Sequence, residues 1–229
     1  MRILCLLGLA ACTTTGSPLP RSNAQVEVHV DPDRSVQLTL TTWNDLAVLR
    51  DAMTAGEITV TVDAQPLLVD TSMTGTFDNG DHYVAAFETA PEATRESPMP
   101  PPDVSTIAIS DGESTWSANV DHMFANDLAP TAPLVSGTNV FEWPSAASPN
   151  AASTITYACV TVNGTAPACE GDGVHDSSID ISQQFVTATI SGASGAHVRV
   201  DGERNVNPDS TGNGPQFITT IAARYTGTL

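Results

Sequence analysis

Two stretches, Val26-Glu27-Val28-His29-Val30 and Val36-Gln37-Leu38-Thr39-Leu40, decide the fold class of this chain. In both, apolar side chains occupy every second position and polar side chains fill the positions between. Successive side chains of a β-strand point to opposite faces of a sheet, so the alternation predicts strands with one buried and one wet face. Strands of this kind are typical of antiparallel sheets.

The same period-two pattern continues to the end of the chain and indicates about eleven strands, rich in Val, Ile and Thr. The further candidate strands are residues 58–62, 83–87, 107–109, 115–120, 140–143, 155–162, 185–190, 198–200 and 217–225. One helix is expected over about residues 45–53, because Asn44 can cap its free amides and Gly56 follows its end. The pattern therefore predicts an all-β chain.

The number of strands predicts two domains, because about 205 residues with this many strands exceed an ordinary single sandwich. Two prolines surround small residues in Ala129-Pro130-Thr131-Ala132-Pro133, and we place the boundary there. The prediction is two antiparallel β-sandwich domains, an acidic one over residues 25–130 and a second over 131–229. Their loosely immunoglobulin-like character rests on strand number and spacing alone.

The charge balance excludes several functions. The 229 residues include 26 acidic and 8 basic side chains, a formal charge of −18, and every basic residue is an arginine. A surface this negative repels phosphate backbones, so no nucleic-acid partner is expected. The absence of lysine excludes Schiff-base catalysis and a P-loop lysine.

The N-terminus carries a short apolar run, residues 3–11, that ends in Leu9-Ala10-Ala11-Cys12. This run is too short to span a bilayer, and with Arg2 before it, it reads as a secretory signal. Leu9-Ala10-Ala11-Cys12 closely resembles the bacterial lipobox. The resemblance implies a signal peptide over 1–11, a lipidated Cys12, and a flexible tether over 12–24. Thr13 after the cysteine implies retention at the outer membrane.

Two cysteines remain after removal of Cys5 and lipidation of Cys12. Cys159 and Cys169 lie on either side of Asn163-Gly164, a strong hairpin signal. A loop of odd length centred on Gly164 places the two cysteines directly opposite each other, whereas a two-residue loop opposes Cys159 to Ala168. We predict the odd-length loop and a disulfide, as suits an oxidising compartment.

The densest acidic loop follows this hairpin and offers oxygen ligands on a glycine-rich backbone, which suit calcium. Its spacing does not match the EF-hand loop, and the alternative is a solvated acidic loop. The candidate calcium ligands are Glu170, Asp172, Asp176 and Asp180.

Catalytic motifs are missing from the sequence. The five histidines form no zinc-binding pair, and Ser194 lies outside a Gly-x-Ser-x-Gly elbow. Of the three tryptophans, Trp116 and Trp143 share the parity of core positions, and Trp43 is expected to be the most exposed while capping the core. We therefore expect a non-catalytic cell-envelope lipoprotein, displayed from the outer membrane towards the periplasm or the surface, with an envelope protein or glycan as partner. The alternatives are a calcium-dependent adhesion or carbohydrate-binding module, and a hydrolase whose triad assembles from distant residues.

Overall fold

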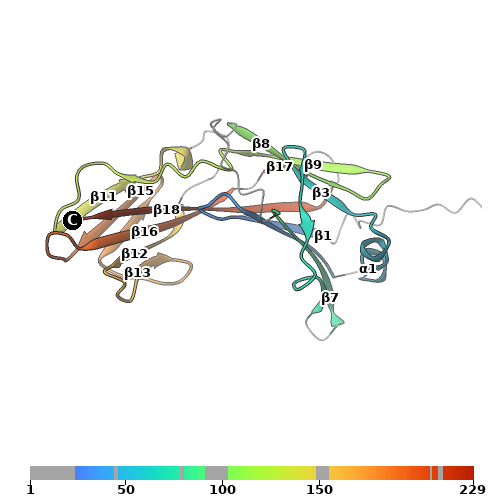
Figure 1. Cartoon of the computed structure of the whole chain (residues 1–229), viewed down its shortest axis with the longest axis horizontal. Coiled ribbons are helices and arrows are strands. Elements are labelled where there is room, and N and C mark those ends of the chain that lie inside the picture. Colours follow the sequence, from blue (N-terminus) through green and yellow to red (C-terminus); the bar gives the residue numbers. More distant parts are fainter. Residues whose placement is uncertain are drawn as a thin grey trace, which may run out of the picture.

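The computed structural model describes residues 24–43, 46–77, 80–90, 103–147, 155–206, 208–210 and 214–229. The described chain is nearly all β and forms an elongated body of three sheets (Figure 1). The alternation read from the sequence sets the buried faces: in β1 (Ala24–Val30), the residues at every second position are buried. The prediction of an all-β fold of the β-sandwich type is confirmed.

The largest sheet has nine strands and runs the length of the molecule. Its strand order is β13-β12-β16-β18-β1-β2-β7-β5, and β6 pairs with β7. Besides β1, its strands are β2 (Val36–Thr42), β5 (Leu68–Val69), β6 (Gly75–Phe77), β7 (His82–Glu88), β12 (Ile155–Val162), β13 (Ala168–Gly171), β16 (His197–Val206) and β18 (Gln216–Thr228).

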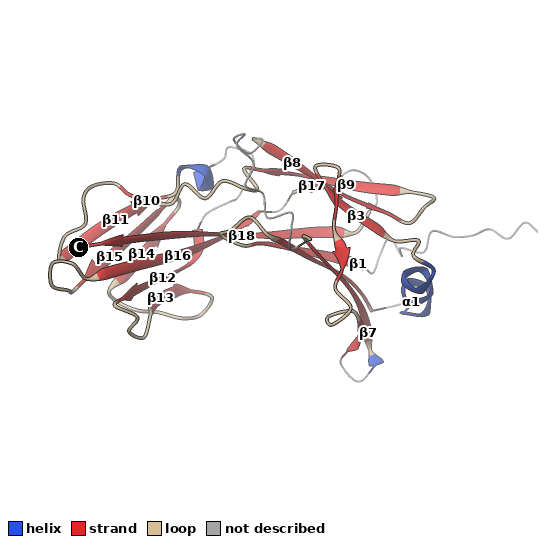
Figure 2. Cartoon of the chain, viewed as in Figure 1, coloured by secondary structure: helices blue, strands red, loops and turns tan. Residues whose placement is uncertain are grey.

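Two smaller sheets lie over opposite halves of the large one, so that the molecule has two lobes (Figure 2). The first lobe has the five-stranded sheet β17-β9-β8-β3-β4, and the second has the four-stranded sheet β10-β11-β15-β14. Their strands are β3 (Thr59–Val62), β4 (Gln65–Pro66), β8 (Val104–Ser110), β9 (Thr115–Asp121), β10 (Ala129–Pro130), β11 (Gly137–Glu142), β14 (Ile179–Ser182), β15 (Phe185–Ile190) and β17 (Asp209–Ser210).

Helix α1 (Leu46–Ala55) lies at the free end of the first lobe. It ends two residues later than predicted. It buries Leu49 and Ala52, and Gly56 follows it in a left-handed conformation, as a helix C-terminus favours. The predicted cap, Asn44, lies outside the described residues. A short 3₁₀ helix, η3 (Pro144–Ala147), was not predicted.

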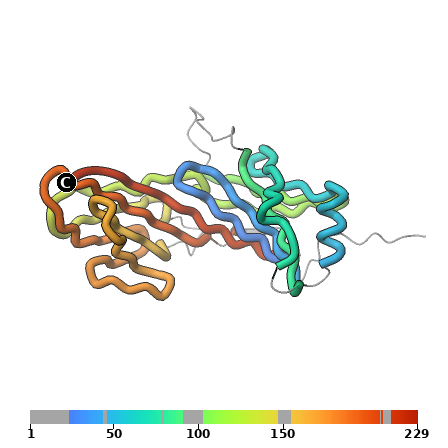
Figure 3. The backbone as a smooth tube through the Cα atoms, turned by 60° about the horizontal axis from the view of Figure 1, so that its bottom comes forward, coloured from blue at the N-terminus to red at the C-terminus, as the bar shows by residue number. Residues whose placement is uncertain are grey.

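The predicted boundary at residue 130 needs correction, because strands on its C-terminal side complete the first lobe. β18 pairs with β1 in the register Gln25↔Gln216 to Val30↔Ile221, and β17 pairs with β9. β16 and β18 have 10 and 13 residues, and at about 3.3 Å per residue β18 extends roughly 40 Å, enough to serve both lobes. The two lobes therefore share continuous strands (Figure 3).

The β1–β18 pair also corrects the expectation of purely antiparallel sheets. These two strands run parallel, whereas the other pairs between the described strands are antiparallel. A parallel pair cannot be joined by a hairpin, and here almost the whole chain separates the two strands. Local alternation therefore carried no sign of it.

Arg204 joins the two lobes from inside. It lies on the inward face of β16 and is fully buried. Its guanidinium donates hydrogen bonds to the backbone oxygens of His122 (2.7 Å), Ser145 (2.8 Å) and Asp121 (3.3 Å), and it lies over the ring of Trp143, 5.3 Å from the centroid. Burial lowers the pKa of Arg204 to about 10, so the group stays charged at neutral pH and its charge is met by backbone carbonyls.

Candidate functional site

The disulfide hairpin β12–β13 borders the candidate site. Cys159 pairs directly with Cys169, and the two form the predicted disulfide, with the sulfurs 2.05 Å apart. Asn163 and Gly164 both have positive φ, and the Thr165 amide donates to the Val162 oxygen, which makes a tight turn. Strand pairing resumes at Val160↔Ala168, so the connection has the predicted odd length.

A polar groove of about 420 Å³ lies on the outward face of the large sheet. Strand register assembles it in rows. One row runs from Cys159 through Asp201 to Arg224, and the next from Tyr157 through Glu203 to Ala222. His29 of β1 and Asp31 and Pro32 of the following turn form its other side. Since the strands concerned are β1, β12, β16 and β18, the groove lies where the two lobes share the large sheet.

Asp201 is the electrostatic centre of this groove. Arg199 and Arg224 each donate a hydrogen bond from Nε to its carboxylate, at 2.6 Å. His29 lies with its Nε2 3.4 Å from the Asp31 carboxylate. Two exposed arginines are thus held side by side on a chain that is otherwise strongly acidic. A polar ligand in the groove would contact both positively and negatively charged side chains.

Glu203 is the half-buried carboxyl of the groove. Burial raises its pKa above the ordinary value. His29 opposes this shift, whereas the nearby carboxylates of Asp172, Asp201 and Asp31 add to it. Glu203 therefore takes up a proton more readily than an exposed glutamate, beside the ring of Tyr157 on the neighbouring strand. An aromatic ring beside hydrogen-bonding carboxyls and arginines is suited to holding a hydroxyl-rich or charged ligand.

The predicted calcium ligands lie near this groove, but the structure uses two of them to hold their own loop. Glu170 Oε2 accepts a hydrogen bond from the Asp176 amide (3.1 Å) and lies 2.7 Å from His175 Nδ1. Asp176 accepts hydrogen bonds from the Ser178 hydroxyl and amide, which lower its pKa.

Asp172 and Asp180 are exposed, the first in a turn and the second in β14. Within the part of the chain that the structure describes, no three His, Cys, Asp or Glu side chains are grouped so as to hold a metal ion. Within this loop, Glu170 and Asp176 thus accept hydrogen bonds from the loop's own amides and from Ser178.

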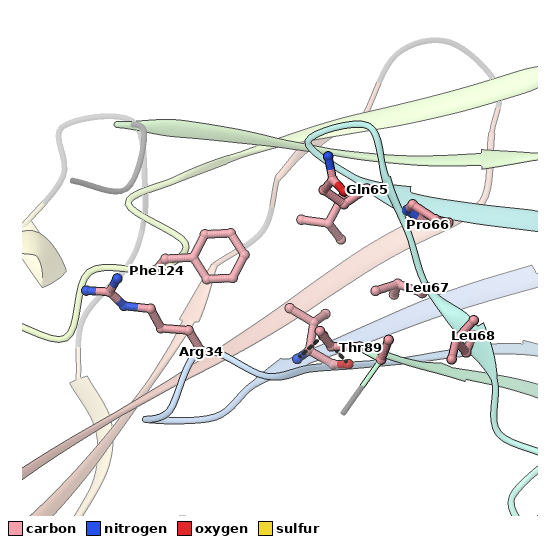
Figure 4. A pocket seen from close by; sticks show the side chains of 10 residues that line it. Arg34, Gln65, Pro66, Leu67, Leu68, Thr89 and Phe124 are labelled. Atoms are coloured by element: carbon pink, nitrogen blue, oxygen red, sulfur yellow. Dashed lines mark hydrogen bonds between the residues drawn. The ribbon is translucent and has the colours of Figure 1, made fainter. Parts of the chain in front are cut away.

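A second, apolar cleft of about 350 Å³ opens between the two sheets of the first lobe. Figure 4 shows Leu67 and Leu68 on one side and Phe124 with Arg34 on the other. At its base the Thr89 hydroxyl accepts a hydrogen bond from the Val36 amide (2.8 Å). Sequence reasoning found neither this cleft nor the polar groove, because both combine strands that are distant in the chain.

Other sequence predictions are settled or lie outside the described residues. Trp116 and Trp143 are buried as predicted, and Trp43 is the most exposed of the three. Cys12 lies outside the described residues. None of the helices within the described ranges combines the length and apolarity needed to cross a bilayer.

Comparison with known proteins gives no family. No family model matches the chain, and no curated protein matches it. Among solved structures, a chimeric titin Z1Z2 tandem functionalized with a fibronectin peptide is 12% identical with a TM-score of 0.20, over 87% of this chain and 95% of that one. The Fcho1 Mu homology domain of Danio rerio, with bound Eps15 peptide, is 7% identical with a TM-score of 0.28, over 90% and 94%. Scores this low carry no functional argument.

Proposed function

We propose that this chain is a non-catalytic β-sandwich module of a bacterial outer-membrane lipoprotein, which holds a polar binding groove away from the membrane. The observation that carries the proposal is the placement of the groove relative to the start of the described chain. Ala24 opens β1 at the end of the first lobe, where it pairs with Thr42. The groove centre at Arg224 lies eight residues further along β18 than Gln216, the partner of Gln25.

The separation follows from strand geometry. At about 3.3 Å per residue, this offset places the groove roughly 25 Å from the end of the lobe where the tether begins. The expected tether over residues 12–24 has a root-mean-square reach of roughly 20 Å. A lipid on Cys12 would therefore hold the first lobe near the membrane and leave the groove accessible to partners in the envelope.

The chemistry of the groove favours a polar partner, and a glycan is the second candidate. Tyr157 offers a ring face beside Glu203, and Asp201 with Arg199 and Arg224 offers acceptors and donors on one flat surface. Sugars are held by this combination of stacking and hydrogen bonding. A charged segment of an envelope protein would use the same arginines.

The anchor is tested with Cys12→Ala. We expect this variant to leave the membrane fraction, because an unlipidated chain retains no acyl group to hold it there. Cys5→Ala is the matched control: it changes the other N-terminal cysteine within the predicted signal and should remain with membranes. A Cys12→Ala protein that still fractionates with membranes contradicts the proposal.

The groove is tested by binding. The purified mature protein is applied to an array of bacterial envelope glycans and to envelope extract, beside Tyr157→Ala and Arg224→Ala. Both variants should lose the captured ligand. Arg50→Ala, which removes an exposed arginine of α1 that lies 3.4 Å from Asp51, should retain it. Equal capture by all four proteins would exclude the groove as the binding surface.

A further inference from the structure

At the free end of the first lobe, four neighbouring strands of the large sheet end side by side. Ala24 of β1 pairs with Thr42 of β2, Thr42 pairs with Tyr83 of β7, and the neighbouring residue His82 pairs with Phe77 of β6. Trp43 follows Thr42 directly. Neighbouring strands are spaced about 4.8 Å apart, and β7 lies between β2 and β6, so Trp43 and Phe77 lie roughly 10 Å from each other at this end of the sheet.

This end of the sheet carries large apolar side chains that are exposed to solvent. Trp43 is 48% exposed and Phe77 is 38% exposed. Helix α1 contacts β7, and its Val48 is exposed as well. The ring of Phe77 stacks on that of His82, with centroids 6.2 Å apart. We call Trp43, Phe77 and His82 the apolar tip.

The apolar tip lies where the chain enters the described structure. Ala24 is in the same row of paired residues as Thr42, and it lies twelve positions after Cys12. The tether expected over residues 12–24 would have a root-mean-square reach of roughly 20 Å. If Cys12 is lipidated, as the proposed function requires, the tip is the part of the folded body held nearest to the bilayer.

We propose that the apolar tip inserts into the interfacial layer of the bilayer to which Cys12 is attached. Tryptophan and other amphipathic rings favour this layer, where one side of the ring is apolar and the other wet. The proposal rests on the proposed function, since without the lipid nothing holds the tip at a membrane. It adds an orientation: the long axis of the large sheet stands away from the membrane.

The charge of the lobe decides which lipid surface fits. Arg50 and Asp51 of α1 form a close pair beside the tip, and the side chain of Asp81, next to His82, is exposed. Residues 25–130, which supply most strands of the first lobe, hold 18 acidic side chains and 3 arginines, so an anionic lipid surface would repel this lobe. The tip therefore suits a zwitterionic surface, or an anionic surface neutralised by divalent cations.

The experiment uses the mature lipidated protein in phosphatidylcholine vesicles whose acyl chains carry bromine, a short-range quencher of tryptophan fluorescence. We expect the vesicles to quench Trp43, and Trp43→Phe to lose that quenching, because Trp116 and Trp143 are buried. A second readout is a polarity-sensitive dye on Phe77→Cys. Its matched control is Val135→Cys, 54% exposed in the second lobe. Only the dye at position 77 should shift to the blue on reconstitution.

The outcomes separate the tip from the anchor. Protein that floats with the vesicles, without quenching of Trp43 and with the same dye spectrum at both positions, overturns the apolar tip and leaves the anchor intact. Protein that fails to float refutes the anchor, and the tip with it. A blue shift at position 77 that appears without vesicles and grows with protein concentration assigns the tip to contact with a second copy and also overturns the proposal.

Discussion

Replacing the buried arginine that joins the two lobes gives the most direct test of this structure. In Arg204→Met, the side chain keeps its approximate length and apolar stem but no longer donates to the oxygens of His122 and Ser145, at 2.7 and 2.8 Å. Hydrogen bonds from a charged donor contribute about 1.5–3 kcal/mol each, so the two short ones together contribute roughly 3–6 kcal/mol.

An opposing term reduces this loss. Burial, partly opposed by the carboxylates of Asp127 and Asp121, lowers the pKa of Arg204 to about 10. At about 1.4 kcal/mol per pKa unit, this net shift corresponds to a cost of roughly 3 kcal/mol for the buried charge, which methionine does not carry. The contact of the guanidinium with the ring of Trp143 stabilises the parent protein, relative to the methionine variant, by about a further 1–2 kcal/mol. We therefore expect Arg204→Met to lower the free energy of unfolding by about 3 kcal/mol, since the hydrogen bonds outweigh the desolvation.

The assay is thermal and urea unfolding of the mature protein. At about 2–4 °C per kcal/mol for a chain of this size, Tm should fall by roughly 6–12 °C. Arg50→Met, the same change at an exposed position, should stay within about 0.5 kcal/mol of the parent. Arg204→Lys should not restore stability, because a single ammonium cannot reach carbonyls on two segments. Arg204→Met as stable as the parent would refute the view that these hydrogen bonds outweigh desolvation.

Three other changes probe separate parts of the fold. Replacing Cys159 and Cys169 together by serine opens a short covalent loop and should cost about 2–3 kcal/mol in unfolding measurements; unchanged stability would show that the hairpin holds without its disulfide. Gly171→Ala should destabilise far more than Gly164→Ala, because an added Cβ would collide with the Thr156 oxygen in the first case and meets nothing within 4 Å in the second; similar Tm values would contradict this. Glu203 has a raised pKa in the folded state, so its contribution to stability is present below the ordinary glutamate pKa and is lost as pH rises through the folded value. Glu203→Gln should therefore raise Tm relative to the parent at neutral pH, and this advantage should disappear below about pH 4.3; an advantage independent of pH would point to packing.

The sequence predicted those features that depend on near neighbours. Alternation in β1 and β2 identified the buried faces, because side-chain direction depends only on position within a strand. The register of the disulfide hairpin followed from Asn163-Gly164 and the positions of the two cysteines. Both predictions needed no knowledge of distant strands.

The features that sequence reasoning missed depend on distant pairing. Local alternation does not encode which strand lies beside β1, and the parallel partner of β1, β18, lies at the far end of the chain. The prediction for β16 covered only residues 198–200, because Gly202 and Arg204 interrupt the apolar series. Yet Arg204 faces inward, where its charge is met by carbonyls from two other segments. The polar groove was missed for the same reason, since its rows exist only after β12, β16 and β18 pair.

The parallel pairing of β1 with β18 also determines how the molecule would resist mechanical load. β1 begins at the free end of the first lobe, and β18 continues past the end of β1 into the second lobe. A pull between the start of β1 and the second lobe runs along both strands in opposite directions. It loads the hydrogen bonds from Gln25 to Val30 in shear, all at once, whereas a hairpin pulled from its open end loses its bonds one after another. A module held at β1 and loaded at the groove would thus bear force in its stronger direction.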